Sequence, residues 1–208
     1  MHLVVSRKWF VALFSFATGT AFFKNIAESA TLRKAKSRDR EAFENLMRQV
    51  SPALNRFANR RLPAGDVDDV LQETWLAAWE RLPSLDDVTR FRPWIFTICY
   101  HKVQDSWRRK HSWAAAEAGA KTEFEAAYFP RDFSQVELRA CLASFWKICP
   151  PEQQEVLRMY YGDQLTLNEI CQILGRNLNT VKYQFYRAHE LAASKLPDFE
   201  TLLGEANL

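Results

Sequence analysis

From residue 40 onward, apolar residues recur with the period of an α-helix along most of the chain. The first such stripe continues beyond Pro52, and because proline is tolerated early in a helix, we expect a new helix to begin there. Runs of Val, Ile and Thr, which favour strands, are few. The pattern therefore predicts an all-α protein. The first stripe consists of Phe43, Leu46, Met47, Val50, Leu54, Phe57 and Ala58.

A second amphipathic segment follows a break at residues 63–65. Asp66 can cap this helix, which we expect to end near Leu82. Its inward face is apolar, with Trp75 and Trp79 beside it. Its outer face is acidic, and adjacent helical carboxylates diverge, so a solvated surface is favoured over a metal site. The outer residues are Asp68, Asp69, Gln72, Glu73 and Glu80.

The next predicted helix opens near Pro93 and is apolar on two sides. Such a helix is either sandwiched between other elements or uses one face for a ligand. Aromatic rings beside cations suit single-stranded nucleic acid, because rings stack on bases and cations follow the phosphates. Both interpretations remain open. One stripe has Ile95, Ile98 and Cys99, and the other has Phe96, Tyr100, Val103 and Trp107 among His101, Lys102, Arg108, Arg109 and Lys110.

Residues 112–135 contain many alanines, a glycine and a proline, and they lack a sustained apolar stripe. This composition is typical of a linker with at most a short helix. Helical spacing resumes at Val136 and continues into the last part of the chain. The chain is therefore predicted to contain two helical modules.

A helix-turn-helix pattern lies in the second module. Thr166 and Glu169 have the spacing of a capping box, in which each side chain satisfies a free backbone donor at the start of a helix. Gly175 stands where a tight exit needs a positive φ, and Asn177 or Asn179 can cap the following helix. These signals predict two short helices joined by a glycine turn.

The second helix of this pattern has one apolar side and one side that is basic and aromatic. A helix with such an exposed face suits recognition of DNA in the major groove. The simpler alternative is a helical hairpin with a solvated basic face. The inward residues are Val181, Phe185, Ala188 and Ala192, and the outward ones are Lys182, Tyr183, Tyr186 and Arg187.

The bulk composition narrows the choice of function. A net charge of +3 over 208 residues is only mildly basic, so a nucleic-acid surface must come from local clustering. We find no phosphate-binding glycine loop, no nucleophile beside a base and no metal motif, and expect neither enzyme activity nor a cofactor. The four cysteines, Cys99, Cys141, Cys149 and Cys171, form no Cys-x-x-Cys pair and are expected to be reduced thiols.

The N-terminus carries a conflicting signal. Arg7 and Lys8 precede an apolar run over residues 9–23, and residues 27–30 resemble the end of a secretory signal. The run is too short and too interrupted for a membrane span. Because export would separate a DNA-binding protein from its DNA, we interpret this segment as an extension unrelated to the core fold. A start site assigned too far upstream would also explain it, and an amphipathic anchor is the lesser option.

In their joint order, the motifs resemble the sigma-70 family of bacterial RNA polymerase sigma factors, in the small extracytoplasmic-function (ECF) group that has only regions two and four. The resemblance covers residues 40–196. The matching stretches are 68–79 (DDVLQETWLAAW), 91–98 (FRPWIFTI), 105–109 (DSWRR), 157–161 (LRMYY), 165–170 (LTLNEI) and 180–182 (TVK).

This resemblance implies two small helical domains, sigma region two and sigma region four with its helix-turn-helix, joined by a flexible linker. The linker would run toward the RNA exit path of the polymerase. The expected boundaries are an N-terminal extension at 1–36, region two at 37–111, the linker at 112–135, region four at 136–198 and a tail at 199–208.

The resemblance also assigns surfaces to partners. Region two would bind core RNA polymerase and melt the minus-ten element, and region four would recognise the minus-thirty-five element. The core-binding residues would be Asp68, Asp69, Gln72 and Glu73. The minus-ten residues would be Trp75, Trp79, Arg90, Trp94, Tyr100, His101, Arg108 and Arg109. The minus-thirty-five residues would be Arg176, Thr180, Lys182, Tyr183, Tyr186 and Arg187.

The implied partners are the β and β′ subunits of core RNA polymerase, promoter DNA and an anti-sigma protein, in the cytoplasm and without a small-molecule substrate. His101, Asn179, Tyr183 and Gln184 differ from the residues usual in the family, which leaves the promoter sequence open. A helix-turn-helix regulator that does not join polymerase would explain region four equally well. It would not explain the acidic helix and the aromatic and basic helix of region two. A membrane-anchored interaction protein would rest on residues 9–23 alone.

Overall fold

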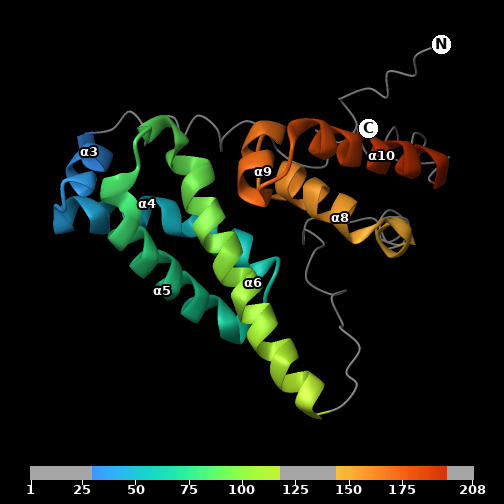
Figure 1. Cartoon of the computed structure of the whole chain (residues 1–208), viewed down its shortest axis with the longest axis horizontal. Helices are drawn as coiled ribbons and strands as arrows, with labels where there is room; N and C mark the ends of the chain where they lie inside the picture. Colours follow the sequence, from blue (N-terminus) through green and yellow to red (C-terminus); the bar gives the residue numbers. More distant parts are fainter. Residues whose placement is uncertain (1–29, 118–143, 196–208) are drawn as a thin grey trace, which may run out of the picture.

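The structure, a computed structural model, describes residues 30–117 and 144–195, and every regular element in these two stretches is a helix (Figure 1). The prediction of an all-α fold is confirmed. In chain order the elements are α3 (Ala30–Lys36), α4 (Arg40–Asn59), α5 (Ala64–Arg81), η1 (Leu82–Ser84), η2 (Val88–Arg90), α6 (Phe91–Glu117), α8 (Pro151–Leu157), η3 (Arg158–Gly162), α9 (Leu167–Leu174) and α10 (Leu178–Lys195).

Several of the sequence-based expectations lie outside the described residues. These are the apolar run at 9–23, residues 118–135 of the expected linker, Cys141, the start of the second module before residue 144, and the tail at 199–208. The first residues of the expected linker, 112–117, form the end of α6.

Helix α3 belongs to the packed core of the first module. Leu32 and Ala35 are almost completely buried, and α3 packs against α4 and η1. Asp39 then caps α4, because its side chain accepts a hydrogen bond of 3.0 Å from the backbone N–H of Ala42. The packed module thus begins by Ala30, inside the stretch that we expected to be an unrelated extension.

Two local expectations for the first module are wrong. Helix α4 runs unbroken through Pro52, because Val50 and Leu54 on either side are fully buried and their packing outweighs one lost backbone bond. Helix α5 begins at Ala64, and Asp66 is not its cap. Asp66 lies in the first turn instead, where its carboxylate pairs with Lys110. Its negative charge also interacts favourably with the positive end of the helix dipole.

Most of both apolar stripes of α6 is buried, although Tyr100 and Trp107 of the second stripe are half-buried. Ile95 and Cys99 on one stripe are fully buried, and Phe96 and Val103 on the other are nearly so. Helices α4, α5 and α9 all pack against α6, so elements of both modules cover it. In Figure 1, α6 crosses the molecule between α5 and the second module.

The two modules form one body in the described structure. Apolar residues of η3, α9 and α10 belong to the same buried cluster as those of α3 to α6. Ion pairs reinforce this contact: Arg61 binds Asp163 at 2.8 Å and Glu155 at 3.0 Å, and Arg60 also binds Asp163 at 2.7 Å. This packing of region against region was not expected from the sequence, which indicated only a linker between them.

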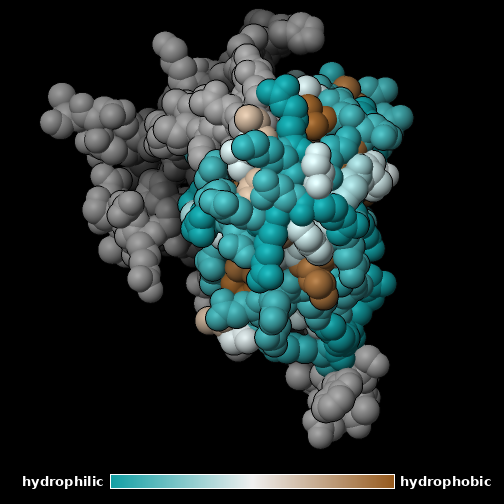
Figure 2. All heavy atoms as spheres, turned by 90° about the vertical axis from the view of Figure 1, so that its left-hand side faces the viewer, coloured by the Kyte–Doolittle hydropathy of each residue, from teal (hydrophilic) through white to brown (hydrophobic). Residues whose placement is uncertain are grey.

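The outer surface is polar over the end of the molecule that carries α3, with only small, separate hydrophobic spots (Figure 2). Among the helices that the structure describes, none has the length and apolar character that crossing a membrane requires.

Candidate functional site

The helix-turn-helix forms as its local sequence predicts. The Thr166 hydroxyl accepts from the Glu169 N–H at 3.3 Å, and the Glu169 carboxylate accepts from the Thr166 N–H at 2.7 Å, which completes the capping box. Gly175 ends α9 with a φ of 61°. The Asn177 side chain then accepts from the Asn179 N–H at 2.8 Å, so Asn177 caps α10.

Helix α10 separates its apolar and polar faces as expected. Val181, Ala188 and Ala192 are buried, whereas Thr180 and the four outward residues are exposed. Tyr183 and Tyr186 are 63% and 58% exposed, so both are accessible to a partner. The outward residues are Lys182, Tyr183, Tyr186 and Arg187.

Arg187 makes a surface ion pair of 2.7 Å with Glu190, and both side chains are more than half exposed. Such a pair contributes little to stability and is readily exchanged for another anion. Arg176 lies in the turn before α10 and is half-buried. This face therefore presents cations and aromatic rings together on the exposed side of one helix.

On α5 the expected core-binding residues divide into two groups. Asp68, Asp69 and Gln72 are exposed. Glu73 is half-buried and binds Arg109 at 3.0 Å and Lys102 at 3.2 Å on α6. Burial raises the pKa of Glu73, but the hydrogen bonds and charges of Arg109 and Lys102 outweigh it, so the pKa lies below its ordinary value.

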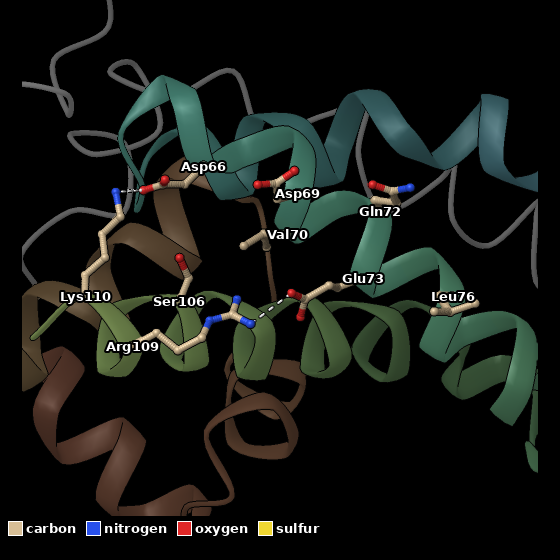
Figure 3. A pocket seen from close by; sticks show the side chains of 9 residues that line it. All are labelled: Asp66, Asp69, Val70, Gln72, Glu73, Leu76, Ser106, Arg109 and Lys110. Atoms are coloured by element: carbon tan, nitrogen blue, oxygen red, sulfur yellow. Dashed lines mark hydrogen bonds and ion pairs between the residues drawn. The ribbon is translucent and has the colours of Figure 1, made fainter. Parts of the chain in front are cut away.

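A groove of about 450 Å³ separates α5 from α6 beside this acidic face. The pair of Asp66 with Lys110 bridges it near the start of α5, and the pair of Glu73 with Arg109 bridges it farther along (Figure 3). Leu76 lies beyond Glu73 and is 62% exposed. The groove thus combines the exposed carboxylate of Asp69, two ion pairs and the exposed aliphatic side chain of Leu76 between two packed helices.

Two of the expected minus-ten residues are packing residues in this structure. Trp75 is 6% exposed and meets Phe43 edge to face, with ring centroids 6.0 Å apart. The centroid of the Trp79 ring lies 4.9 Å from that of Phe43, and the Arg38 guanidinium lies 5.4 Å from the Trp79 centroid. The burial of Trp75 argues against direct contact with a base in this arrangement.

The other expected minus-ten residues are more accessible. Arg90, His101, Arg108 and Arg109 are exposed, whereas Trp94 and Tyr100 are half-buried. Burial raises the pKa of the Tyr100 phenol, and the nearby Glu155 carboxylate adds to this effect. Glu155 belongs to the second module, so Tyr100 lies close to the junction of the two modules.

Sequence reasoning missed two buried arginines at this junction. Arg92 donates to the backbone oxygen of Gln164 at 2.6 Å and pairs with Glu169 of the capping box at 3.3 Å. For Arg61, burial alone would lower the pKa, but the charges of Asp163 and Glu155 raise it above its ordinary value. Nothing in the local pattern distinguishes these arginines from exposed ones.

The described thiols and acidic groups were the remaining candidates for reactive or metal-binding side chains. Burial raises the pKa of Cys99 to about 12 and that of Cys149 to about 11, so both are unreactive thiols. In the described part of the chain, no three His, Cys, Asp or Glu side chains are grouped as metal ligands would be.

Family comparisons cover both modules. Residues 46–113 match the model of sigma-70 region 2, and residues 150–190 match that of sigma-70 region 4. Together these two stretches make up more than half of the chain.

Three curated relatives are sigma factors. RNA polymerase sigma factor NccH of Alcaligenes xylosoxydans xylosoxydans is 38% identical over 79 residues, and CnrH of Cupriavidus metallidurans is 36% identical over 83 residues. These alignments cover 38% and 39% of this chain but only 42% and 44% of the two relatives. The ECF RNA polymerase sigma-E factor of Escherichia coli is 21% identical over 183 residues, or 83% of this chain and 96% of that protein.

Two solved structures share the fold. The structure of CnrH in complex with the cytosolic domain of CnrY aligns with a TM-score of 0.56 and 25% identity, over 82% of this chain and 97% of CnrH. The sigma factor RpoE of Bartonella quintana, in complex with the anti-sigma factor NepR, aligns with a TM-score of 0.59 and 20% identity, over 74% and 96%. With both regions matched in order, the chain belongs to the sigma-70 family of RNA polymerase sigma factors, in its ECF group.

Proposed function

We propose that this protein binds core RNA polymerase and directs it to initiate transcription at specific promoters. The observation that carries the proposal is the combination, in one chain, of region two with region four, whose helix-turn-helix exposes a cationic and aromatic face. A regulator that only bound DNA would have no use for the acidic face of α5 and its groove. The chemistry of RNA synthesis would remain with the polymerase, without a cofactor or small-molecule substrate of this chain.

The polymerase would dock on the exposed part of α5. Asp68, Asp69 and Gln72 present carboxylates and an amide to solvent, and Leu76 adds an aliphatic side chain beside the groove. A basic helical surface of the β or β′ subunit fits this composition, because complementary charge speeds and orients docking while the aliphatic contact lowers the dissociation rate.

The two DNA elements would be recognised by different modules. Helix α10 would enter the major groove of the minus-thirty-five element with Lys182, Tyr183, Tyr186 and Arg187, while Arg176 and Thr180 contact the adjacent backbone. The exposed residues of α6 and η2 would hold the opened minus-ten strand. Opening costs a few kcal/mol per unstacked base, which stacking and phosphate contacts must return.

A protein inhibitor is the proposed regulator. The neighbouring structures contain a sigma factor with an anti-sigma factor and CnrH with the cytosolic domain of CnrY. By analogy, we infer that an anti-sigma protein sequesters this chain in the cytoplasm, where its polymerase and DNA are.

Run-off transcription with purified core polymerase tests the proposal. We expect promoter-specific transcripts and permanganate-reactive thymines near the minus-ten element only when core and this protein are both present. Open thymines with the protein alone would contradict the proposal. So would the absence of specific transcripts when the protein and core polymerase are given a promoter library and genomic fragments.

A further inference from the structure

Gln184 occupies an unusual place on the proposed recognition helix. It is the neighbour of the exposed Tyr183, yet it is only 8% exposed itself. Its side chain oxygen accepts from Nη1 of Arg176 at 3.1 Å, and its side chain nitrogen donates to the carboxylate of Glu152 at 3.4 Å. A buried glutamine therefore connects the first turn of α8 with the turn of the helix-turn-helix.

These two bonds fix the direction of the Gln184 amide. A guanidinium can only donate and a carboxylate can only accept, so one orientation of the amide satisfies both partners and the flipped one satisfies neither. Gln184 itself is nearly inaccessible to water, although Glu152 is exposed and Arg176 half-buried, so its amide relies on these two partners for its hydrogen bonds. Gln184 thus offers a fixed acceptor to Arg176.

The backbone of Arg176 is held as well. It follows Gly175, whose φ is 61°, and its N–H donates to the carbonyl of Cys171 at 3.0 Å. The remaining freedom of Arg176 lies in its long side chain, which the bond to Gln184 restricts. That bond uses one of the five N–H donors of the guanidinium, and a phosphate can accept from others.

Arg176 also lies near enough to Tyr100 on α6 to lower its pKa electrostatically, against the larger effect of burial. Tyr100 belongs to region two, so Arg176 would lose Tyr100 as a neighbour whenever the two modules separate. The bond to Gln184 lies wholly within region four and would persist.

We propose that Gln184 is a positioning residue for DNA recognition: it orients the Arg176 guanidinium toward a backbone phosphate beside the minus-thirty-five element. This inference rests on the proposed function of α10 as the DNA reader. Glu152 acts one step farther away, because it holds the amide in the orientation that presents its oxygen to Arg176.

Salt dependence of promoter binding by the reconstituted holoenzyme tests the proposal. Losing one phosphate contact lowers the slope of log affinity against log salt by about 0.9. We expect this reduction for Arg176→Ala and, importantly, also for Gln184→Met, which changes no charge. Both should weaken binding roughly fivefold at all minus-thirty-five sequences alike. Gln49→Met, the same change at an exposed site on α4, should leave slope and affinity unchanged.

A swapped pair provides the rescue. In the double variant Gln184→Glu with Glu152→Gln, the new carboxylate can accept from Arg176 and from the new amide, so both bonds are restored at the same net charge. We expect the slope of the unmodified protein to return. A structural defect at Gln184 would instead lower the melting temperature and leave the slope unchanged.

A wild-type slope for folded Gln184→Met would overturn the proposal, and so would a further loss when Gln184→Met is added to Arg176→Ala. If Gln184→Met does not fold, the double variant Gln184→Glu with Glu152→Gln decides instead. The proposal is overturned if that double variant folds and its slope is not restored. Lys182→Ala and Arg187→Ala separate this inference from the proposed function: if they too leave promoter binding unchanged, α10 is not the reader at all.

Discussion

Arg38 has a left-handed backbone, with φ of 69°, between α3 and α4. This conformation costs a residue other than glycine about 1–2 kcal/mol. The side chain compensates, because it donates to the carbonyls of Trp79 and Glu80 at 3.2 and 3.4 Å and lies over the Trp79 ring. Arg38 thereby satisfies carbonyls at the end of α5 that have no partner within the helix.

These opposing effects predict an order of stability. Arg38→Gly loses the side-chain contacts but relieves the backbone, and we expect it to stay within about 1 kcal/mol of the parent. Arg38→Ala loses the contacts and keeps the strain, so we expect it to be less stable than Arg38→Gly by about 1 kcal/mol. Urea unfolding of the two variants measures the difference, and the reverse order would refute the account.

Arg187 is the exposed cation of α10 that we expect to contact a base or phosphate. Arg187→Ala should lower transcription from a cognate promoter at least about tenfold while core binding is retained. Glu190→Ala removes only the surface partner of Arg187 and is the matched control, expected to have a small effect. Multiple-round transcription and a core capture assay report the two quantities. Equal transcription by Arg187→Ala and Glu190→Ala would show that Arg187 does not contact DNA.

At the scale of elements, glycine has opposite effects in α5 and at the end of α9. Gly175 has a positive φ and Gly65 lies in the first turn of α5, and a Cβ at either position would meet no atom within 4 Å. Space is therefore equal at the two sites, and only the backbone conformation differs.

The matched pair of substitutions isolates this difference. Gly175→Ala should destabilise the protein by about 1 kcal/mol because alanine disfavours positive φ. Gly65→Ala should stabilise it by up to about 1 kcal/mol because alanine is the better helix former. Thermal unfolding of both variants checks the signs. A destabilising Gly65→Ala would show that α5 needs glycine for a reason other than its helix.

The acidic face of α5 is predicted to bind polymerase as a surface of the whole helix. Asp69→Lys should weaken capture of core polymerase at least about tenfold, because a like charge then faces a basic partner. Glu44→Lys makes the same change in charge on exposed α4 and should have little effect. Helical content should be unchanged in both. Unaltered capture by folded Asp69→Lys would exclude this face.

At the scale of the whole molecule, the junction between modules must open for the proposed function. The two promoter elements are roughly 25 base pairs apart, or about 85 Å at 3.4 Å per base pair. Modules that share one buried core cannot span this distance. The described body is therefore a closed form, and its ion pairs would be broken when both elements are bound.

Two measurements test this closed form. Dyes placed at exposed positions 44 and 193 should show high energy transfer in the free protein and low transfer in the holoenzyme. Asp163→Ala leaves Arg61 buried without its main partner and should destabilise the free protein by about 3–5 kcal/mol. Glu44→Ala, which breaks an exposed pair with Arg40, should cost less than about 1 kcal/mol. Constant energy transfer on adding core would contradict the opening.

Sequence alone determined the features that depend on neighbours along the chain. Thr166 with Glu169, the φ of Gly175 and the two faces of α10 could all be predicted, because caps, turns and helical periodicity are set within a few residues. The order of the motifs also determined the family. The same local reasoning failed at Pro52 and Asp66, where burial of flanking residues and a partner forty-four positions away decided the outcome.

Only the tertiary structure decided which charged and aromatic residues are available. The resemblance assigned Trp75 to promoter DNA and nothing in the sequence pattern indicated a role for Arg61, yet Trp75 is buried against Phe43 and Arg61 between Asp163 and Glu155. Their partners lie 32 to about 100 residues away, beyond the reach of any periodicity. Burial and ion pairing are properties of residues that meet in space, and helix packing, which brings them together, depends on the whole chain at once.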